Sequence, residues 1–240
     1  MELDILAIGV HPDDVELSCT GTLLHYIGLQ KKVGLLDLTR GELGTRGNAK
    51  IRTEEANEAA RLMGALIRVQ LEMQDGFFEH DKENLIPIIE VLRKYRPDIV
   101  MTNALDDRHP DHGRAAKLTA DACYLSGLQK IETFDPQSGQ VQEKWRPRTV
   151  MHYIQDYYSN PDFVFDITPY FTKKMEIISA FKSQFYDPES KEPESPISGK
   201  EFLSFLEGRA RQMGRPAGIE LAEGFHISRI FGVKDIFDLV

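Results

Sequence analysis

Short apolar runs alternate with amphipathic segments along the first two thirds of the chain. Five runs have the length and composition of buried strands, at residues 3–10, 32–39, 67–73, 98–103 and 149–156. Helical periodicity lies between them, most clearly over residues 83–95, where four apolar side chains form one stripe: Leu85, Ile88, Ile89 and Leu92. Strands that alternate with helices indicate βαβ units with right-handed crossovers. We therefore predict an α/β fold, a Rossmann-like three-layer αβα arrangement with a mainly parallel sheet.

The pattern loosens after about residue 130. Residues 133–147 predict a hairpin or excursion, and helices are expected near 171–185 and over 200–213. Residues 187–199 are rich in Pro, Glu and Ser, which is typical of a flexible loop that could close over a pocket. No linker divides the chain. We predict a single domain over residues 1–240, with a Rossmann-like core at 1–130 and a C-terminal part at 131–240 that completes the sheet and its helices.

Charge and composition narrow the possible partners. A formal net charge of −9 argues against general binding to nucleic acid, which needs cations to neutralise phosphates. No apolar stretch approaches the roughly 20 residues of a membrane span, and the first residues lack the basic region of a secretory signal. Cys19 and Cys123 lie far apart in predicted helices, which fits a reducing compartment better than a disulfide framework. We expect a cytoplasmic protein that binds neither nucleic acid nor membranes.

Two similar turns follow the first and fourth predicted strands, HPDD at residues 11–14 and HPDH at 109–112. In the common strand order 3-2-1-4, strands one and four are neighbours at the point where strand order reverses, and ligands bind beyond the carboxyl ends of strands there. We therefore predict the active site at the C-terminal ends of these two strands. Six groups that bind protons or metals would meet there: His11, Asp13, Asp14, His109, Asp111 and His112.

This collection suits a catalytic zinc site, which commonly has three protein ligands and one position for water. His11, Asp14 and His112 form a plausible ligand set. Asp13 is left as a general base and His109 as an acid or oxyanion donor, and Asp111 could orient either histidine.

Other interpretations remain open. An Asp between a strand and a helix is often only an N-cap, and His226 could reach the site or lie outside it. A nucleotide-binding Rossmann domain needs a glycine-rich first turn, which HPDDVELS lacks. A phosphohydrolase with an aspartyl nucleophile and a non-catalytic scaffold are the further alternatives.

At these motifs the chain resembles the LmbE-like, or PIG-L-type, zinc-dependent N-deacetylases. GVHPDDVE and HPDH match the two family motifs, and residues 39–64, LEMQDG (71–76) and AEGF (222–225) are similar to the branch that makes bacillithiol. The resemblance implies removal of acetate from N-acetyl-D-glucosaminyl-L-malate. It implies Zn²⁺, or another divalent cation such as Fe²⁺, on His11, Asp14 and His112. It also implies a base at Asp13, an acid at His109 and a homo-oligomer, trimer or hexamer.

Substrate-binding residues are expected among the polar groups of the loops. In the resemblance, sugar-binding roles fall on Glu42 and Arg52. Arg46, Arg52 and Arg108 lie in or beside loops at the carboxyl ends of strands, and arginine suits the two carboxylates of malate. Each arginine could instead pair with the surplus Asp and Glu of the chain. Deacetylation of another N-acetylated sugar or small metabolite is the nearest alternative function.

Overall fold

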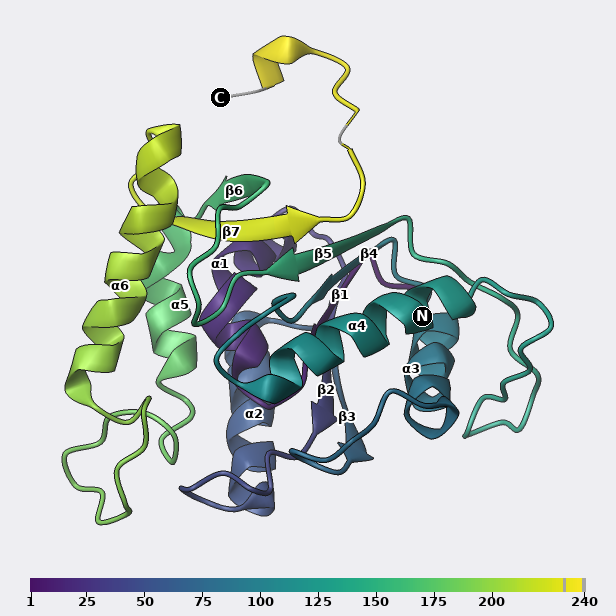
Figure 1. The fold of residues 1–240 in the computed structure, drawn as a ribbon, viewed down its shortest axis with the longest axis horizontal. Coiled ribbons are helices and arrows are strands. Elements are labelled where there is room, and N and C mark those ends of the chain that lie inside the picture. Colours follow the sequence, from purple (N-terminus) through teal and green to yellow (C-terminus); the bar gives the residue numbers. More distant parts are fainter. Residues whose placement is uncertain (231, 239–240) are drawn as a thin grey trace.

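A seven-stranded sheet in the order β3-β2-β1-β4-β5-β7-β6 forms the centre of the structure, a computed structural model in which residues 1–230 and 232–238 are described (Figure 1). Its strands are β1 (Ile5–Gly9), β2 (Val33–Thr39), β3 (Ile67–Met73), β4 (Ile99–Thr102), β5 (Thr149–Tyr153), β6 (Phe163–Asp166) and β7 (Ala222–Ile227). The α-helices are α1 (Asp14–Gly28), α2 (Ala49–Met63), α3 (Lys82–Tyr95), α4 (Pro110–Leu125), α5 (Phe171–Ile178) and α6 (Lys200–Gly214). Short 3₁₀ helices are η1 (Thr168–Tyr170), η2 (Arg215–Ala217) and η3 (Ile236–Asp238).

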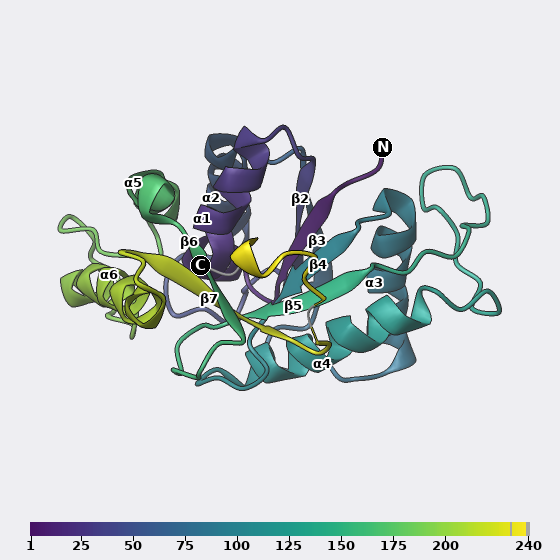
Figure 2. The same cartoon turned by 90° about the horizontal axis from the view of Figure 1, so that it is seen from above.

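Alternate residues of the central strands face two different helical layers. In β1, Ile5 and Ala7 pack with residues of α1, α2 and α5, whereas Leu6 and Ile8 pack with residues of α3 and α4. Figure 2 shows the sheet between these two groups of helices. Burial on both faces explains why β1 and β2 are continuously apolar or nearly so. The predicted three-layer αβα fold is confirmed.

Strand order brings the two HPD turns together. Strands β1 to β5 pair in parallel, and β1 lies directly beside β4, with Ile5, Leu6 and Ala7 paired to residues 99–101. The predicted order 3-2-1-4 is therefore correct. β7 runs antiparallel to both β5 and β6, so the sheet is mainly rather than wholly parallel.

The second half of the chain differs from the sequence prediction in three places. β6 and β7 were not predicted, because β6 has only four residues and β7 contains Glu223 and Gly224 within an otherwise apolar run. The strand expected over 149–156 ends at Tyr153. The helix expected over 171–185 ends at Ile178, and turns with i→i+3 hydrogen bonds replace it at Ala180 and Phe181. Phe181 and Phe185 are buried in the core, so their apolar spacing imitated a helical stripe.

Residues 133–147 form the expected excursion, closed by an antiparallel bridge between Phe134 and Val141. Cys19 and Cys123 are buried and unpaired, in α1 and α4. Within the described residues, none of the helices is both long and apolar enough to cross a bilayer.

Candidate functional site

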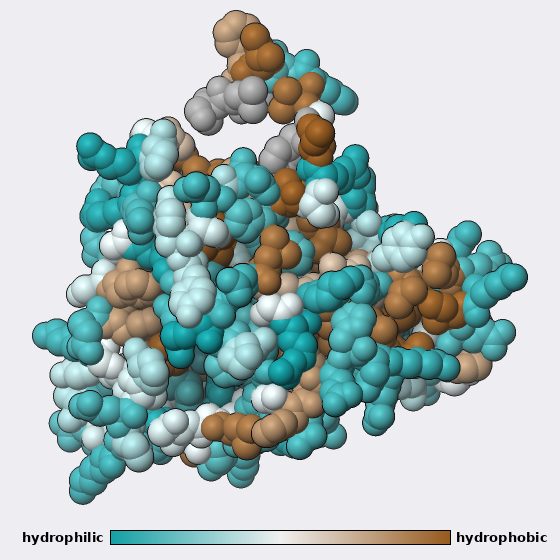
Figure 3. All heavy atoms as spheres, in the orientation of Figure 1, coloured by the Kyte–Doolittle hydropathy of each residue, from teal (hydrophilic) through white to brown (hydrophobic). Residues whose placement is uncertain are grey.

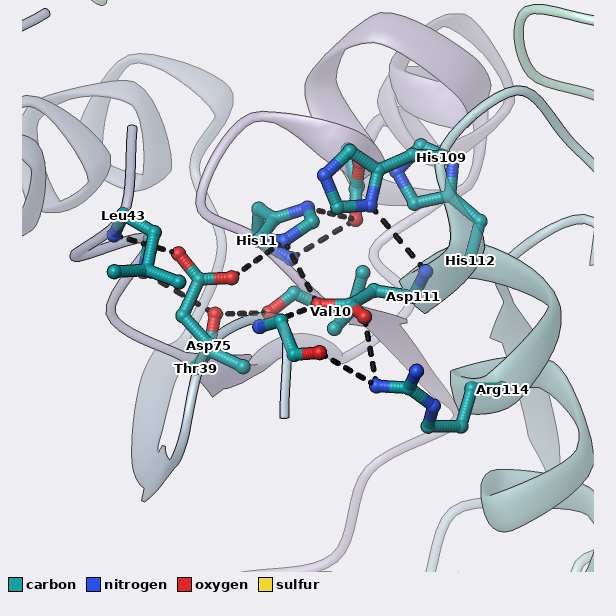
Figure 4. A network of polar contacts seen from close by, with 12 residues as sticks. Val10, His11, Thr39, Leu43, Asp75, His109, Asp111, His112 and Arg114 are labelled. Carbon is teal, nitrogen blue, oxygen red and sulfur yellow. Dashed lines mark hydrogen bonds and ion pairs between the residues drawn. The ribbon is translucent and has the colours of Figure 1, made fainter. Parts of the chain in front are cut away.

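The two HPD turns lie at the adjacent carboxyl ends of β1 and β4 and lead into α1 and α4. Their rings are close: the centroids of His11 and His109 are 4.7 Å apart, and those of His11 and His112 are 5.7 Å apart. Figure 4 shows the three histidines gathered at one place, with carboxylates around them. Residues separated by almost a hundred positions in the sequence thus share one site.

Each of the two proposed histidine ligands has one ring nitrogen on a carboxylate. His112 Nδ1 lies 2.5 Å from Asp107 Oδ2, and His11 Nε2 lies 3.0 Å from Asp75 Oδ1. The carboxylates accept hydrogen bonds, so these nitrogens carry the protons. The remaining nitrogen of each ring faces Asp14, at 3.2 Å from His112 Nε2 to Oδ1 and 3.8 Å from His11 Nδ1 to Oδ2.

Asp14 is held in place by neutral donors as well. Its Oδ2 accepts hydrogen bonds from the backbone N–H of His11 (2.9 Å) and from Asn103 Nδ2 (2.9 Å), and its Oδ1 accepts one from Gln155 Nε2 (3.1 Å). Burial alone would raise the pKa of Asp14, but the nearby imidazoles of His112 and His11 hold this pKa far below its ordinary value. Asp14 is therefore a fixed anion.

Asp13 has a different environment although it is the next residue. Its backbone is in the left-handed region with φ of 116°, a rare conformation for a non-glycine residue that clusters at functional sites. Its carboxylate accepts a hydrogen bond from Arg52 Nη2 at 3.1 Å. Burial raises the pKa of Asp13 to about 7, with Arg52 acting in the opposite direction. A carboxyl group that titrates near neutral pH is suited to take up a proton and release it.

His109 stands beside both ligand histidines and is only half-buried. Its Nδ1 accepts a hydrogen bond from the backbone N–H of Asp111 at 3.3 Å. Burial and the positive charges of His11 and His112 lower the pKa of His109. Asp111, predicted to orient a histidine, lies 3.6 Å from His11 Nε2 and also accepts hydrogen bonds from Gly76 N and Arg114 Nη1.

The protonation of the two ligand histidines follows from their carboxylate neighbours. Burial works against the charged form of His11, but the carboxylates of Asp111 and Asp75 outweigh it and raise its pKa to about 9. Burial is likewise outweighed at His112, whose pKa is raised to about 10 by Asp14 and Asp107. The site therefore attracts positive charge.

Sequence reasoning missed three residues of this network: Asn103, Asp107 and Gln155. Asn103 directly follows β4 and Gln155 is the second residue after β5, so the rule that ligands bind at carboxyl ends of strands could have found them. Asp107 lies just before HPDH, and its pairing with His112 depends on the path of the loop between β4 and α4.

A cavity of about 340 Å³ opens above these groups. Polar residues of both HPD turns form one side, and apolar residues of α6 form another: Phe202, Phe205, Leu206, Ala210 and Met213. Ser195, Pro196 and Ile197, from the predicted loop at 187–199, also line it. The volume falls in the range of small-molecule sites, which is about 300–1,000 Å³.

The expected substrate-binding residues have varied positions. Arg46, Arg52 and Arg108 line the cavity, whereas Glu42 is not among its lining residues and accepts a hydrogen bond from the backbone N–H of Asp75 at 2.9 Å. His226 lies outside the cavity, with its Nε2 2.8 Å from Ser159 Oγ.

Comparison with known proteins agrees with this geometry. The family model described as "PIG-L: GlcNAc-PI de-N-acetylase" matches residues 6–123, which contain both HPD turns. A solved structure, that of a conserved protein from Thermus thermophilus, superimposes with a TM-score of 0.83 at 30% identity over 97% of this chain and 98% of that one. The chain belongs to the PIG-L family.

Relatives of this chain are named for more than one reaction. The diacetylchitobiose deacetylase of Thermococcus kodakarensis is 27% identical over 191 residues, 75% of this chain and 70% of the relative. The 4-oxalmesaconate hydratase of Pseudomonas putida is 25% identical over 158 residues, 60% of this chain and 55% of the relative. Membership of the PIG-L family supports deacetylase activity. The substrate has to be inferred from the geometry of the site.

The donor set fits a divalent metal ion. Zinc–ligand bonds of about 2 Å in a tetrahedral site place neighbouring ligand atoms about 3.3 Å apart. The contact of Asp14 Oδ1 with His112 Nε2, at 3.2 Å, is of this length, and His11 Nδ1 lies 3.8 Å from the other carboxylate oxygen, Oδ2. Carboxylates on the outer nitrogens of both histidines leave the inner nitrogens free to bind a metal. Two sets of described residues have ligand atoms within 4.8 Å of one another, His11 with His109 and His112, and His11 with Asp75 and Asp111. The predicted set of His11, Asp14 and His112 is not one of these two.

Proposed function

We propose that this protein is a metal-dependent N-deacetylase that hydrolyses the acetamide of an N-acetylglucosaminide to acetate and a free amine. Its substrate in this proposal is N-acetyl-D-glucosaminyl-L-malate, in bacillithiol biosynthesis in the cytoplasm. The observation that carries the proposal is that Asp13 and His109 line the same cavity as His11, Asp14 and His112, with short contacts between members of this group.

The metal would be held by His11, Asp14 and His112, with Zn²⁺ the preferred ion and Fe²⁺ an alternative. When bound, a divalent ion supplies Lewis-acid polarisation of the acetamide carbonyl and lowers the pKa of water. Asp75 and Asp107 fix the ring orientations of the two histidines, because each carboxylate accepts a hydrogen bond from the outer nitrogen.

Asp13 acts as the general base. Its carboxylate accepts a proton from the attacking water while the oxygen of that water forms a bond to the acetamide carbon. Arg52 holds this carboxylate through Nη2 and also donates to the backbone carbonyl of Pro12 at 2.8 Å, so the turn and the base are fixed together.

His109 acts on the leaving group. An amine leaves poorly as its anion, so the nitrogen must gain a proton as its bond to carbon breaks. The ring of His109 lies beside that of His11, with centroids 4.7 Å apart, so its proton is available at the end of the cavity where the leaving nitrogen would lie. Before that step its N–H can donate to the developing oxyanion.

The cavity accommodates a monosaccharide with a small substituent. We assign substrate contact to Arg108, and we assign to Arg52, Arg46 and Glu42 the shaping of the loop that borders the substrate. Arg52 Nη1 donates to Gly41 O at 3.0 Å, and Gln184 Nε2 donates to Arg46 O at 2.9 Å. These bonds hold the loop between β2 and α2 against the cavity.

Acetate release from a panel of acetylated compounds tests the proposal. The panel holds N-acetyl-D-glucosaminyl-L-malate, N-acetylglucosamine, diacetylchitobiose and a simple N-acetylated amine, each with zinc-loaded protein. We expect the malate glycoside to have the highest kcat/KM. Acetate release from none of them, together with addition of water to an unsaturated dicarboxylate, would assign the chain to the hydratase-like members instead.

We further propose that the protein is a homo-oligomer, a trimer or hexamer. The described residues after β7 extend away from the body of the fold (Figure 1), and large apolar side chains among them lie in solvent, with Ile230, Ile236 and Phe237 exposed by 94%, 73% and 86%. Figure 3 shows hydrophobic residues on this extension. Sedimentation equilibrium of the full chain tests this state directly.

A further inference from the structure

Four arginines line the cavity, and their hydrogen bonds separate them into two kinds. Arg46 and Arg52 use both terminal nitrogens within the protein: Arg46 donates to Phe185 O and Ser190 Oγ, and Arg52 donates to Gly41 O and the Pro12–Asp13 turn. These two side chains are buried. Their terminal nitrogens already donate hydrogen bonds that hold neighbouring loops in place.

Arg209, on α6, is different. Its Nη2 donates to the backbone carbonyl of Asp156, while Nη1 is buried and has no partner among the described residues. The guanidinium lies over the ring of Phe205, 4.9 Å from the centroid. Guanidinium groups remain charged in proteins, and a buried donor without an acceptor is costly. Arg209 therefore lines the main cavity with a guanidinium group that lacks one hydrogen-bond acceptor.

Arg108 lies on the other side of the same aspartate. Its Nε pairs with the carboxylate of Asp156, and its side chain is 44% exposed. Within the described part of the chain its terminal nitrogens have no hydrogen-bond partner. Two arginines thus bracket one aspartate, which leaves a net positive charge and free N–H groups on both.

A side pocket of about 230 Å³ opens at this point. It shares six lining residues with the main cavity, Arg108, Asp156, Pro196, Ile197, Phe202 and Phe205, and it adds Glu201. The side pocket therefore continues the main cavity away from the histidines, with an arginine on one wall and aromatic rings on another. A substituent attached to a sugar in the main cavity would extend into it.

We propose that the aglycone of the substrate binds where the main cavity, which Arg209 lines, meets this side pocket, and that Arg209 together with Arg108 selects an aglycone that carries a carboxylate. The inference rests on the proposed function, since it places the acetylated sugar in the main cavity. A carboxylate at this junction lies beside the guanidinium groups of both arginines and can accept hydrogen bonds from them. Arg209 is a specificity-determining residue in this arrangement, and takes no part in the hydrolysis itself.

The test compares one glycoside in two forms, N-acetyl-D-glucosaminyl-L-malate and the same compound with both carboxylates as methyl esters. The diester loses both negative charges and gains two methyl groups, and comparison of the native protein with the arginine variants separates the effect of charge from that of size. For the native protein we expect a higher kcat/KM for the diacid. Arg209→Gln is expected to lower the ratio of kcat/KM, diacid over diester, by about 10- to 100-fold, the usual effect of losing a hydrogen bond to a charged group.

Two further variants complete the test. Arg108→Gln should lower the same ratio, and because Arg108 is half exposed this variant serves if Arg209→Gln does not fold. Arg211→Gln is the matched control, since Arg211 is on the same helix and is exposed. It pairs with Glu207 and Glu220 and does not line the cavity. We expect this control to keep the native ratio.

Binding to metal-free protein, measured by calorimetry with both forms, separates the subsite from the catalytic proposal. If no form is hydrolysed but Arg209→Gln weakens binding of the diacid alone, the subsite stands and the deacetylase function fails. If Arg209→Gln and Arg108→Gln leave the diacid-to-diester ratio unchanged in both binding and turnover, the subsite is overturned, whatever the activity.

Discussion

Asp13 combines a rare backbone conformation, burial and a hydrogen bond from an arginine at one residue. Its φ of 116° lies in the left-handed region, and its carboxylate faces Arg52. Substitution Asp13→Asn keeps the shape but removes the base, so kcat should fall by about 10²–10⁴ while metal content is unchanged. Turnover and metal content are measured on the same sample. Asp98→Asn, an exposed aspartate at the opposite end of β4, is the control. Native turnover in metal-loaded Asp13→Asn would remove Asp13 from the mechanism.

Asp107 acts through His112 and makes a separate prediction. Its Oδ2 lies 2.5 Å from His112 Nδ1, and its Oδ1 accepts from the backbone N–H of Tyr157 at 2.6 Å. Asp107→Asn replaces the acceptor that fixes the ring, so the Kd for Zn²⁺ should rise about 10- to 100-fold in a chelator competition. The adjacent, exposed Asp106→Asn should bind zinc as the native protein does. Equal zinc affinity in the two variants would show that Asp107 does not position His112.

At the scale of elements, Arg46 fastens two loops to each other. The loop between β2 and α2 supplies Arg46 and Gly47, and the segment after α5 supplies Phe185, Ser190 and the Glu192 carboxylate, which accepts from Gly47 N at 2.7 Å. These hydrogen bonds attach residues 187–199, which contribute to the cavity wall, to the loop between β2 and α2.

Arg46→Gln should release this stretch. We expect trypsin to cleave after Lys191 at least about tenfold faster than in the native protein, because protease access requires local opening of the segment. Arg40→Gln, whose guanidinium is exposed and contacts Glu72, should be cleaved at the native rate. Equal cleavage in both variants would mean that other contacts hold the segment.

The elements that the sequence predicted well are those buried on both sides. β1 and β2 are apolar throughout or nearly so, and the four-residue stripe of α3 faces the core, so local patterns identified them. β7 was missed because Glu223 is a core residue: its carboxylate accepts from Gly21 N and Thr22 N in α1 and pairs with Lys174 at 2.7 Å. A buried carboxylate satisfied by distant donors leaves no local apolar pattern.

The same distinction applies to the site. The HPD turns were found because their residue types and their places after strands are local features. Asp107 and Gln155 were missed as partners because their roles depend on contacts with His112 and Asp14, from other segments. The arginines were expected to face substrate, yet Arg46 and Arg52 donate mainly to backbone carbonyls and neighbouring loop residues, which only the tertiary structure reveals.

For the whole molecule, the charges of the site link metal binding to stability. The pKa values of His11 and His112 are raised from 6.5 to about 9 and about 10 in the folded, metal-free protein. A raised pKa contributes stability that is complete below the unfolded value of about 6.5 and is lost as pH rises through the folded value.

The melting temperature of metal-free protein should therefore fall between pH 7 and pH 10. The zinc-loaded protein should show a smaller fall, because the metal already requires unprotonated ring nitrogens. The double variant His11→Gln/His112→Gln should also show a smaller fall, since it lacks both titrating groups. A melting temperature of the metal-free protein that is constant or rises over this range would contradict these charge states.

The proposed function depends on a single metal ion shared by the two turns that follow β1 and β4. Zinc titration of the metal-free native protein, of His11→Gln and of His112→Gln is the most direct measurement of that. One equivalent should bind tightly to the native chain, and loss of either histidine should remove this tight site, because each turn supplies a ligand that the other cannot replace. Retention of one equivalent at native affinity by either variant would show that the two turns do not form a common site.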